Sequence, residues 1–256
     1  MQKEQGIENS FAKEEEIDAL CKGNYQGKNQ KIHGGSYIVV PQHENLNIKS
    51  FTIQAFIFPT TPDKGRQGIV TKFNEKEKTG YGLFIDENGC LSLEIGDGSQ
   101  VVKISSEKKL LRKVWYLAVA TFDAETKKVH LYQEPRVTST NGGLGMAILN
   151  PLEETSASIE SFSSVLPASN DSPLLVAAST LHNRTGRKIS GGHFKEVPHP
   201  IELPEQQCCF NGKIDRPRLS NIALSKENIE TLASSYDECN TTVRSTVVGA
   251  LDFHAN

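Results

Sequence analysis

The spacing of apolar side chains between residues 113 and 135 is typical of two half-buried strands. In KVWYLAVATFDAETKKVHLYQEP, Trp115, Leu117 and Val119 occupy every second position of one run, and Val129 and Leu131 do so in the next. Successive side chains of a strand leave opposite faces, so a period of two predicts strands. The polar run DAETKK lies between them and predicts a turn. The whole stretch is therefore interpreted as an antiparallel hairpin.

Short runs of the same kind recur along the chain: SYIVV, KSFTIQAFIFP, QGIVTKF, GYGLFID, CLSLEIG, QVVKIS and LLVAAST. In the second of these, Phe51, Ile53, Ala55 and Ile57 share one face. The sequence ENG, between GYGLFID and CLSLEIG, predicts a hairpin turn that needs positive φ. Short strands at close intervals, with no helix between them, predict an all-β antiparallel sandwich or barrel.

The remaining segments suggest the domain organisation. Residues 1–31 form a polar segment and linker, in which IENSFAKEEEIDALCKG is compatible with a short helix. The sandwich is assigned to residues 32–240, where CCFNGKIDRPRLSNIAL returns to strand and SKENIETLASSY predicts a short helix with Ser225 as its N-cap. Residues 241–256, which include STVVGALDF, are interpreted as the start of a strand that leads to an absent downstream domain.

Composition narrows the class of protein. A net charge of −3 with scattered Lys and Arg argues against a nucleic-acid surface, which needs a concentrated basic face. The apolar runs are too short to span a bilayer, and the N-terminus has no secretory h-region. No C-x-x-C pair occurs, and the cysteines are expected to be buried apolar groups of a cytoplasmic protein; they are Cys21, Cys90, Cys208, Cys209 and Cys239.

Catalytic motifs are absent from the sequence, which has no P-loop, dinucleotide-binding, H-E-x-x-H, G-x-S-x-G or EF-hand pattern. The paired carboxylates of jelly-roll glycosidases would appear as E-x-D-x-E on one strand. Glu16 and Asp18 give a partial match, which a solvated helix face explains better. His182 and His193 flank one loop, and a metal site there would need a third ligand such as Glu196 or His199.

Acidic loop tips are the other candidates for metal binding. Asp86 with Asn88, Asp97, and Asp123 with Glu125 could supply oxygen ligands to calcium. The same residues are what hairpin turns require, and the turn interpretation is favoured. The residues therefore assign no catalytic group and no metal ligand, and any ligand-binding residue stays unknown.

The order of several motifs resembles laminin-G-like, concanavalin A-like domains. The motifs are SFTIQAFIFP, QGIVTKF, GYGLFIDENGCLSLEIG, VWYLAVATFDAETKKVHLY and FNGKIDRPRLSNIALSKENIETL, and the resemblance covers roughly residues 34 to 236. It implies a jelly roll of two packed antiparallel sheets, with Trp115 in the core and the helix after residue 225 covering one side.

A narrower resemblance is to the large (beta) subunit family of N,N-dimethylformamidase. It rests on YQGKNQKIHGGSYIVV, FIFPTTPDKGRQGIVTKF, LYQEP, FNGKIDRPRL and VVGALDF. The last resembles an AWDF junction, with Leu251 in place of Trp. The resemblance implies a mononuclear iron site of Tyr, Glu and His, downstream of this region, and no catalytic residue carries over to the present chain.

Three functional hypotheses follow, and the first two come from different classes. The first is a non-catalytic, structural or interaction domain of an amidohydrolase. Its partners would be the catalytic domain of the parent chain, a small subunit or a second copy, and iron would belong to the catalytic half. The alternative is a stand-alone carbohydrate-binding module, for which Tyr81, Tyr132 and Phe194 are the candidate stacking platforms. A glycosidase is the third and weakest reading, because paired acids are lacking.

Overall fold

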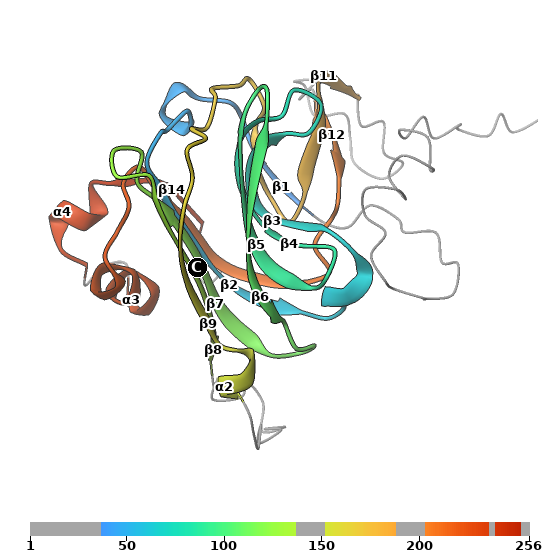
Figure 1. Cartoon of the computed structure of the whole chain (residues 1–256). Helices are drawn as coiled ribbons and strands as arrows, with labels where there is room; N and C mark the ends of the chain where they lie inside the picture. Colours follow the sequence, from blue (N-terminus) through green and yellow to red (C-terminus); the bar gives the residue numbers. More distant parts are fainter. Residues whose placement is uncertain (1–36, 137–151, 188–202, 236–238, 252–256) are drawn as a thin grey trace, which may run out of the picture.

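Two β-sheets packed face to face make up most of the computed structural model (Figure 1). The structure describes residues 37–136, 152–187, 203–235 and 239–251. The all-β sandwich predicted from the alternating pattern is confirmed. The segment predicted as an N-terminal helix lies outside the described residues.

The sheet called sheet A has eight strands. Its main path runs, in spatial order, through β1 (Ile38–Val40), β10 (Leu174–Val176), β3 (Gln67–Asn74), β4 (Thr79–Ile85), β5 (Cys90–Asp97) and β6 (Val101–Lys109). Off this path, β11 (Ser179–Arg187) pairs with β3 and with β12 (Leu203–Gln207). The main path is antiparallel throughout, so its strands can be joined by short hairpins.

The sheet called sheet B has six antiparallel strands. In spatial order they are β14 (Val247–Ala250), β13 (Gly212–Ser220), β2 (Phe51–Pro59), β7 (Trp115–Phe122), β8 (Lys128–Arg136) and β9 (Ala157–Phe162). The hairpin predicted over residues 113–135 is confirmed as β7 and β8, which pair in register from Phe122 with Val129 to Trp115 with Arg136. The described helices are η1 (Glu44–Leu46), η2 (Pro62–Lys64), α2 (Leu152–Thr155), α3 (Lys226–Ser234) and α4 (Thr241–Arg244).

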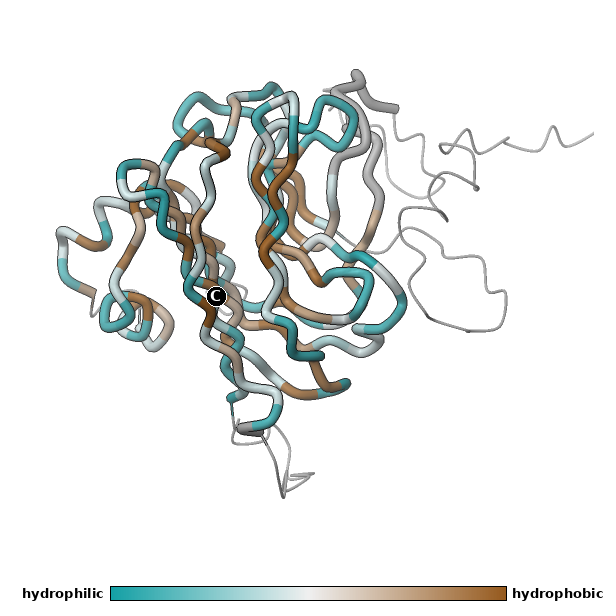
Figure 2. Tube along the Cα trace, viewed as in Figure 1, coloured by the Kyte–Doolittle hydropathy of each residue, from teal (hydrophilic) through white to brown (hydrophobic). Residues whose placement is uncertain are grey.

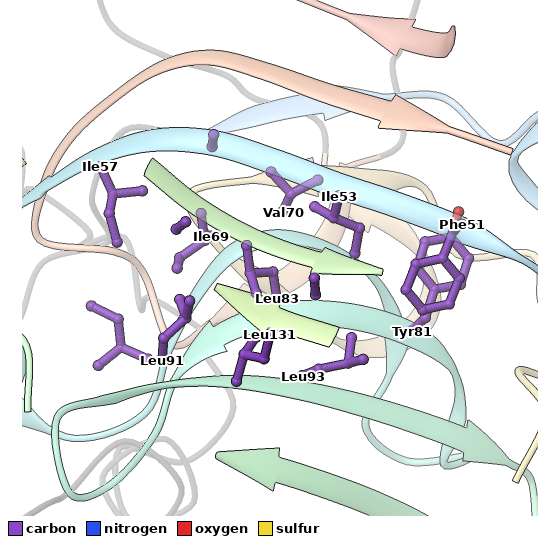
Figure 3. Close-up of a cluster of buried hydrophobic side chains, with 14 of the residues drawn as sticks. Phe51, Ile53, Ile57, Ile69, Val70, Tyr81, Leu83, Leu91, Leu93 and Leu131 are labelled. Atoms are coloured by element: carbon purple, nitrogen blue, oxygen red, sulfur yellow. The ribbon is translucent and has the colours of Figure 1, made fainter. Parts of the chain in front are cut away.

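The apolar faces of the two sheets meet in one core between them (Figure 3). The face predicted for β2 is confirmed, because Phe51, Ile53, Ala55 and Ile57 are all 0% exposed. Tyr81 of β4 stacks on Phe51 with ring centroids 4.7 Å apart. Figure 2 shows the hydrophobic residues as bands along the facing strands, while the connecting loops are largely hydrophilic.

Helix α3 covers part of the outer face of sheet B. Ser225 is its N-cap, as predicted, and its side chain accepts a hydrogen bond from the backbone N–H of Asn228. Ile229 and Leu232 of α3 are buried in a cluster with Leu117 of β7. An amphipathic helix thus hides apolar side chains that alternate with those of the core.

The prediction that Trp115 belongs to the core is wrong. Trp115 is half-buried and packs against Phe58 with ring centroids 5.3 Å apart. It has the same parity along β7 as Leu117 and Val119, which pack in the cluster that contains the α3 residues, whereas Tyr116 is in the core between the sheets. The tryptophan therefore lies on the outer face of sheet B.

Of two further local predictions, the one about a turn is confirmed and the one about a pair of cysteines is wrong. In the ENG turn, Gly89 adopts a φ of 83°, as the turn was expected to require. Cys208 and Cys209 were expected within a strand, but they lie between β12 and β13, and Cys208 has a φ of 50°. All four described cysteines, which include Cys90 and Cys239, are buried thiols outside disulfides.

Candidate functional site

Arg66, Glu75 and Glu94 form a buried charge cluster at sheet A. The guanidinium Nε and Nη2 of Arg66 donate to the two carboxylate oxygens of Glu94, at 3.0 and 2.6 Å, and Nη1 donates to Glu75 at 2.5 Å. The side chains of Arg66, Glu94 and Glu75 are only 5%, 8% and 12% exposed. The guanidinium also lies 3.9 Å from the ring centroid of Phe84.

The ionisation of this cluster is set by burial and by its internal charges. Burial opposes the charge of Arg66, but Glu94 and Glu75 together raise its pKa well above the ordinary value. Burial raises the pKa of Glu75, an effect that Arg66 and the hydroxyl of Ser179 oppose. A raised carboxyl pKa is a property of general acids. Here, however, Oε1 of Glu75 already accepts hydrogen bonds from Arg66 and from Ser179 at 2.6 Å, so the cluster serves to hold the elements together.

A second buried cation, Lys72 of β3, is enclosed by oxygen atoms. Its Nζ donates to Gln42 Oε1 at 2.6 Å, to the carbonyl oxygens of Asn170 and Ser172 at 3.0 and 2.8 Å, and to Asn170 Oδ1 at 3.3 Å. Lys72 is 1% exposed. Burial lowers the pKa of its ammonium group to about 8, against the attraction of Asp171. The lysine ties two loops to β3 of sheet A.

We expect Lys72 to make the stability of the protein depend on pH above neutrality. Its folded pKa of about 8 lies below its ordinary value of 10.5, so between these values the native state binds fewer protons than the unfolded state. Stability therefore rises with pH in this window. From pH 7 to pH 9 the wild type should gain about 1.4 kcal/mol relative to Lys72→Met, measured by urea unfolding. A difference that stays constant or shrinks would contradict the assignment, and Lys113→Met, in an exposed turn, is the control.

The motif LYQEP has structural roles on both faces of β8. The carboxamide of Gln133 is 0% exposed and makes four hydrogen bonds across the β6 side of the sandwich. Glu134 lies on the outer face, where its carboxylate forms ion pairs with Arg136 and Lys226, each at 3.1 Å. Pro135 lies beyond the last residue of β8 that pairs with β9, so its missing N–H leaves no bond to β9 unmade.

The aspartate carboxylate at each acidic loop tip accepts hydrogen bonds from residues of its own turn. Asp86 Oδ1 accepts from the N–H groups of Asn88 and Cys90, both at 2.9 Å. Asp97 accepts from residues 99 and 100, which lowers its pKa to about 2. Asp123 accepts from the Thr126 hydroxyl and from the N–H of Glu125. These contacts match the turn interpretation rather than a calcium site.

The other predicted metal ligands fall largely outside the described residues. His182 is in β11, whereas His193, Glu196 and His199 lie outside the described part of the chain. Within that part, no three His, Cys, Asp or Glu side chains converge as a metal site would require.

The candidate stacking platforms have different positions. Tyr81 is 2% exposed and donates from its hydroxyl to the carbonyl of Leu46, so no sugar can stack on it. Tyr132 is half-buried on the outer face of sheet B, parallel to His130 with ring centroids 6.0 Å apart. Phe194 lies outside the described residues. Sequence reasoning missed Phe162 of β9, which is 68% exposed on the same side as His130.

A cavity of about 240 Å³ lies between the sheets, at the side where β1 and β14 form their edges. Aliphatic side chains from both sheets line it: Val40, Leu46, Val70, Leu174, Val176, Leu219, Val248 and Leu251. Arg218 is also at its wall, but it alternates with core residue Leu219 in β13 and lies near Cys239 of the outer-face cluster. Its charge therefore points to the opposite face, and the cavity is apolar.

Gly249 of β14 leaves part of this cavity empty. A Cβ added there would meet Leu219 at 3.6 Å and Leu174 at 3.9 Å, which are ordinary contacts. Gly249→Ala is therefore expected to raise the free energy of unfolding by about 0.5 to 1 kcal/mol, because it adds packing and restricts the unfolded chain. Urea unfolding measures this. The control Gly96→Ala should destabilise, since its Cβ would lie 2.2 Å from the carbonyl oxygen of Lys78.

Comparisons with known proteins agree with this geometry. Residues 33–149 match the family described as the concanavalin A-like lectin/glucanases superfamily. The N,N-dimethylformamidase beta subunit of Paracoccus aminophilus is 31% identical over 228 residues, which is 86% of this chain and 27% of that subunit. The chain resembles one segment of this beta subunit.

Further comparisons define the limits of the likeness. The dimethylformamidase beta subunit of an Alcaligenes species is 30% identical over 225 residues, again 86% of this chain and 27% of the relative. The chain thus spans about a quarter of the length of these relatives. A candidate carbohydrate-binding protein from Bacteroides ovatus has the same fold, with a TM-score of 0.50 at 14% identity over 86% of this chain and 50% of the other. No helix among the described residues is long and apolar enough to cross a membrane.

Proposed function

We propose that this chain is the non-catalytic sandwich domain of a cytoplasmic amidohydrolase that resembles N,N-dimethylformamidase. The observation that carries the proposal is the identity of 30 to 31% with two beta subunits, along 86% of the chain. The chain matches only 27% of each relative, which supports a division of labour in which chemistry belongs to the unmatched part.

The contacts of the described ionisable groups support a structural role. Glu75 and Glu94 are bound to Arg66, Lys72 is bound by loop oxygens, and Asp86 is bound by its own turn. The iron implied by the resemblance is accordingly assigned to the polypeptide outside the matched segment. Buried cysteines that form no disulfide among the described residues support a reducing compartment such as the cytoplasm.

Hydrolysis of N,N-dimethylformamide to formate and dimethylamine tests this proposal. Dimethylamine release is measured with the purified chain alone and with the native assembly that contains it. The assembly is expected to hydrolyse this or a related amide, and the isolated chain is not. Activity of the isolated chain would overturn the non-catalytic role, and an inactive assembly, tested with iron supplied, would overturn the link to amidohydrolases.

One observation favours carbohydrate binding as a second candidate function. The outer face of β8 and β9 presents the exposed ring of Phe162, which lies opposite Lys128 and two positions along β9 from Glu160, and Glu160 lies 3.4 Å from His130. An exposed ring with planar polar neighbours is an arrangement on which a sugar can stack. If a glycan array gives a ligand, Phe162→Ala should abolish its binding while Ile222→Ala, at another exposed apolar residue, should not. Binding that survives Phe162→Ala would exclude this face.

A further inference from the structure

The two edges on one side of the sandwich differ from those on the other. On one side, β6 has the sequence VVKISSEKK and β9 has ASIESF, so both carry charged residues. On the other side, β1 has the sequence IVV and β14 has VVGA, with no charge and no proline, whereas β12, which ends the branch of sheet A through β11, has LPEQQ and carries both. Natural proteins usually protect free edges with charges or proline, because an unprotected edge pairs with other strands.

The apolar cavity opens between these two uncharged edges. Val40 of β1 and Val248 of β14 both line it, so it is bounded by one edge strand of each sheet. Its volume of about 240 Å³ exceeds the roughly 150 Å³ of apolar cavities known to hold a benzene molecule. One large aliphatic or aromatic side chain would therefore fit, and it would complete the contacts of the surrounding aliphatic groups.

We propose that β14 pairs with an added β-strand, which inserts a large apolar side chain into this cavity. The strand belongs to the polypeptide that corresponds to the unmatched part of the dimethylformamidase beta subunit, whether or not both parts share one chain. This inference rests on the proposed function and adds the surface through which the sandwich is held. This chain matches only 27% of each beta subunit, so most of the subunit lies outside the matched segment and is available to contact it.

The geometry of β14 suits strand addition. Among the described strands it pairs only with β13, so its other edge has no strand partner there, and its residues are half-buried or exposed. Main-chain hydrogen bonds would supply the pairing, and the cavity would select for a bulky apolar residue at one position of the added strand. Gly249 keeps the cavity wall open at the middle of β14.

Amide hydrogen exchange tests the inference on the native assembly, purified through a tag on this chain, against the chain alone. Exchange of residues 247–250 is expected to slow by about tenfold or more in the assembly, while β6 and β9 change little. The bound polypeptide, identified by mass spectrometry, should resemble the unmatched part of the beta subunits. Protection at β6, β9 or α3 instead, or a second copy of this chain as the occupant of β14, would overturn the inference but leave the proposed function standing. A chain that has no partner would overturn both.

A pair of matched variants gives an independent test. Ala250→Lys places a charge at the exposed end of β14, and Val101→Lys places one at the exposed start of β6. Thermal unfolding first checks that both variants fold. The assembly is expected to dissociate with Ala250→Lys and to persist with Val101→Lys, as measured by gel filtration. If a folded Ala250→Lys chain keeps its partner with unchanged protection at 247–250, or if only Val101→Lys loses it, the inference is wrong. Where the two parts share one chain, loss of protection at 247–250 replaces dissociation as the readout.

Discussion

Replacing Arg66 with methionine is expected to lower the free energy of unfolding by about 3 to 5 kcal/mol. The change leaves Glu75 and Glu94 in their buried positions without the guanidinium that now compensates both charges. It also removes the contact of that guanidinium with the ring of Phe84. Urea unfolding at pH 7 measures the loss. Arg112→Met is the matched control, because its ion pair with Asp63 is about half exposed, and it should cost at most about 1 kcal/mol.

The loss of unfolding free energy caused by Arg66→Met should depend on pH, and the direction of this dependence identifies the cause of the loss. Burial already raises the pKa of Glu75 and Arg66 opposes this effect, so without the arginine the folded pKa of Glu75 rises further above its unfolded value and the native state binds more protons than the unfolded state. The contribution of this group is then most favourable at low pH and becomes unfavourable as the pH rises past the unfolded pKa. The deficit should be smaller at pH 4 than at pH 8, and adding Glu75→Gln and Glu94→Gln should reduce it at pH 8. A deficit that is equal at both pH values would mean that lost packing, not buried charge, is responsible.

The sandwich could be predicted because its strands keep a strict alternation. Phe51, Ile53, Ala55 and Ile57 were placed on one face from the sequence, and all four are in the core. Alternation shows which side chains share a face, but it does not show which face becomes the core. Trp115 was misplaced for this reason, since α3 provides a second apolar environment on the outer face of β7.

The buried polar clusters could not be predicted, because their partners come from distant parts of the chain. Arg66 meets Glu94 28 positions later, and Lys72 meets Asn170 98 positions later. A lysine or arginine in a strand or loop usually signals solvent exposure. Only the geometry of several loops makes these two positions buried, and no local pattern encodes that geometry.

The candidate site was predictable only in part, and for a related reason. The resemblance to the dimethylformamidase beta subunit was visible in short motifs, among them LYQEP and VVGALDF. The cavity next to β14 was not visible, because it is formed by edge strands that are more than 200 residues apart in the sequence. An uncharged strand is ordinary in sequence, and it becomes informative only when the topology shows that it lies at an edge.

Replacing Gln133 with leucine is expected to lower the free energy of unfolding by about 3 to 4 kcal/mol. The carboxamide Nε2 donates to the carbonyl oxygens of Lys108 and Thr155, at 3.1 and 2.8 Å. Its Oε1 accepts from the Ser106 hydroxyl at 2.8 Å and from the N–H of Leu91 at 3.3 Å. Leucine has a similar size but offers none of these bonds, so several buried polar groups would lose their partners.

The comparison of two substitutions separates hydrogen bonding from packing at this position. Gln133→Glu preserves the shape and the acceptor, but at pH 8 it cannot donate to the two carbonyls and it adds a buried charge. It should therefore be at least as destabilising as Gln133→Leu at pH 8 and recover as the pH falls toward 4, where a protonated carboxyl regains one donor. Gln100→Leu, in an exposed turn, is the control and should change stability by about 0.5 kcal/mol or less.

Because Gln133 connects β8 to β5, β6 and α2, faster amide exchange in all four elements of the leucine variant would show that it joins the two sheets on the side opposite the cavity. Faster exchange confined to β8 would show that its role is local.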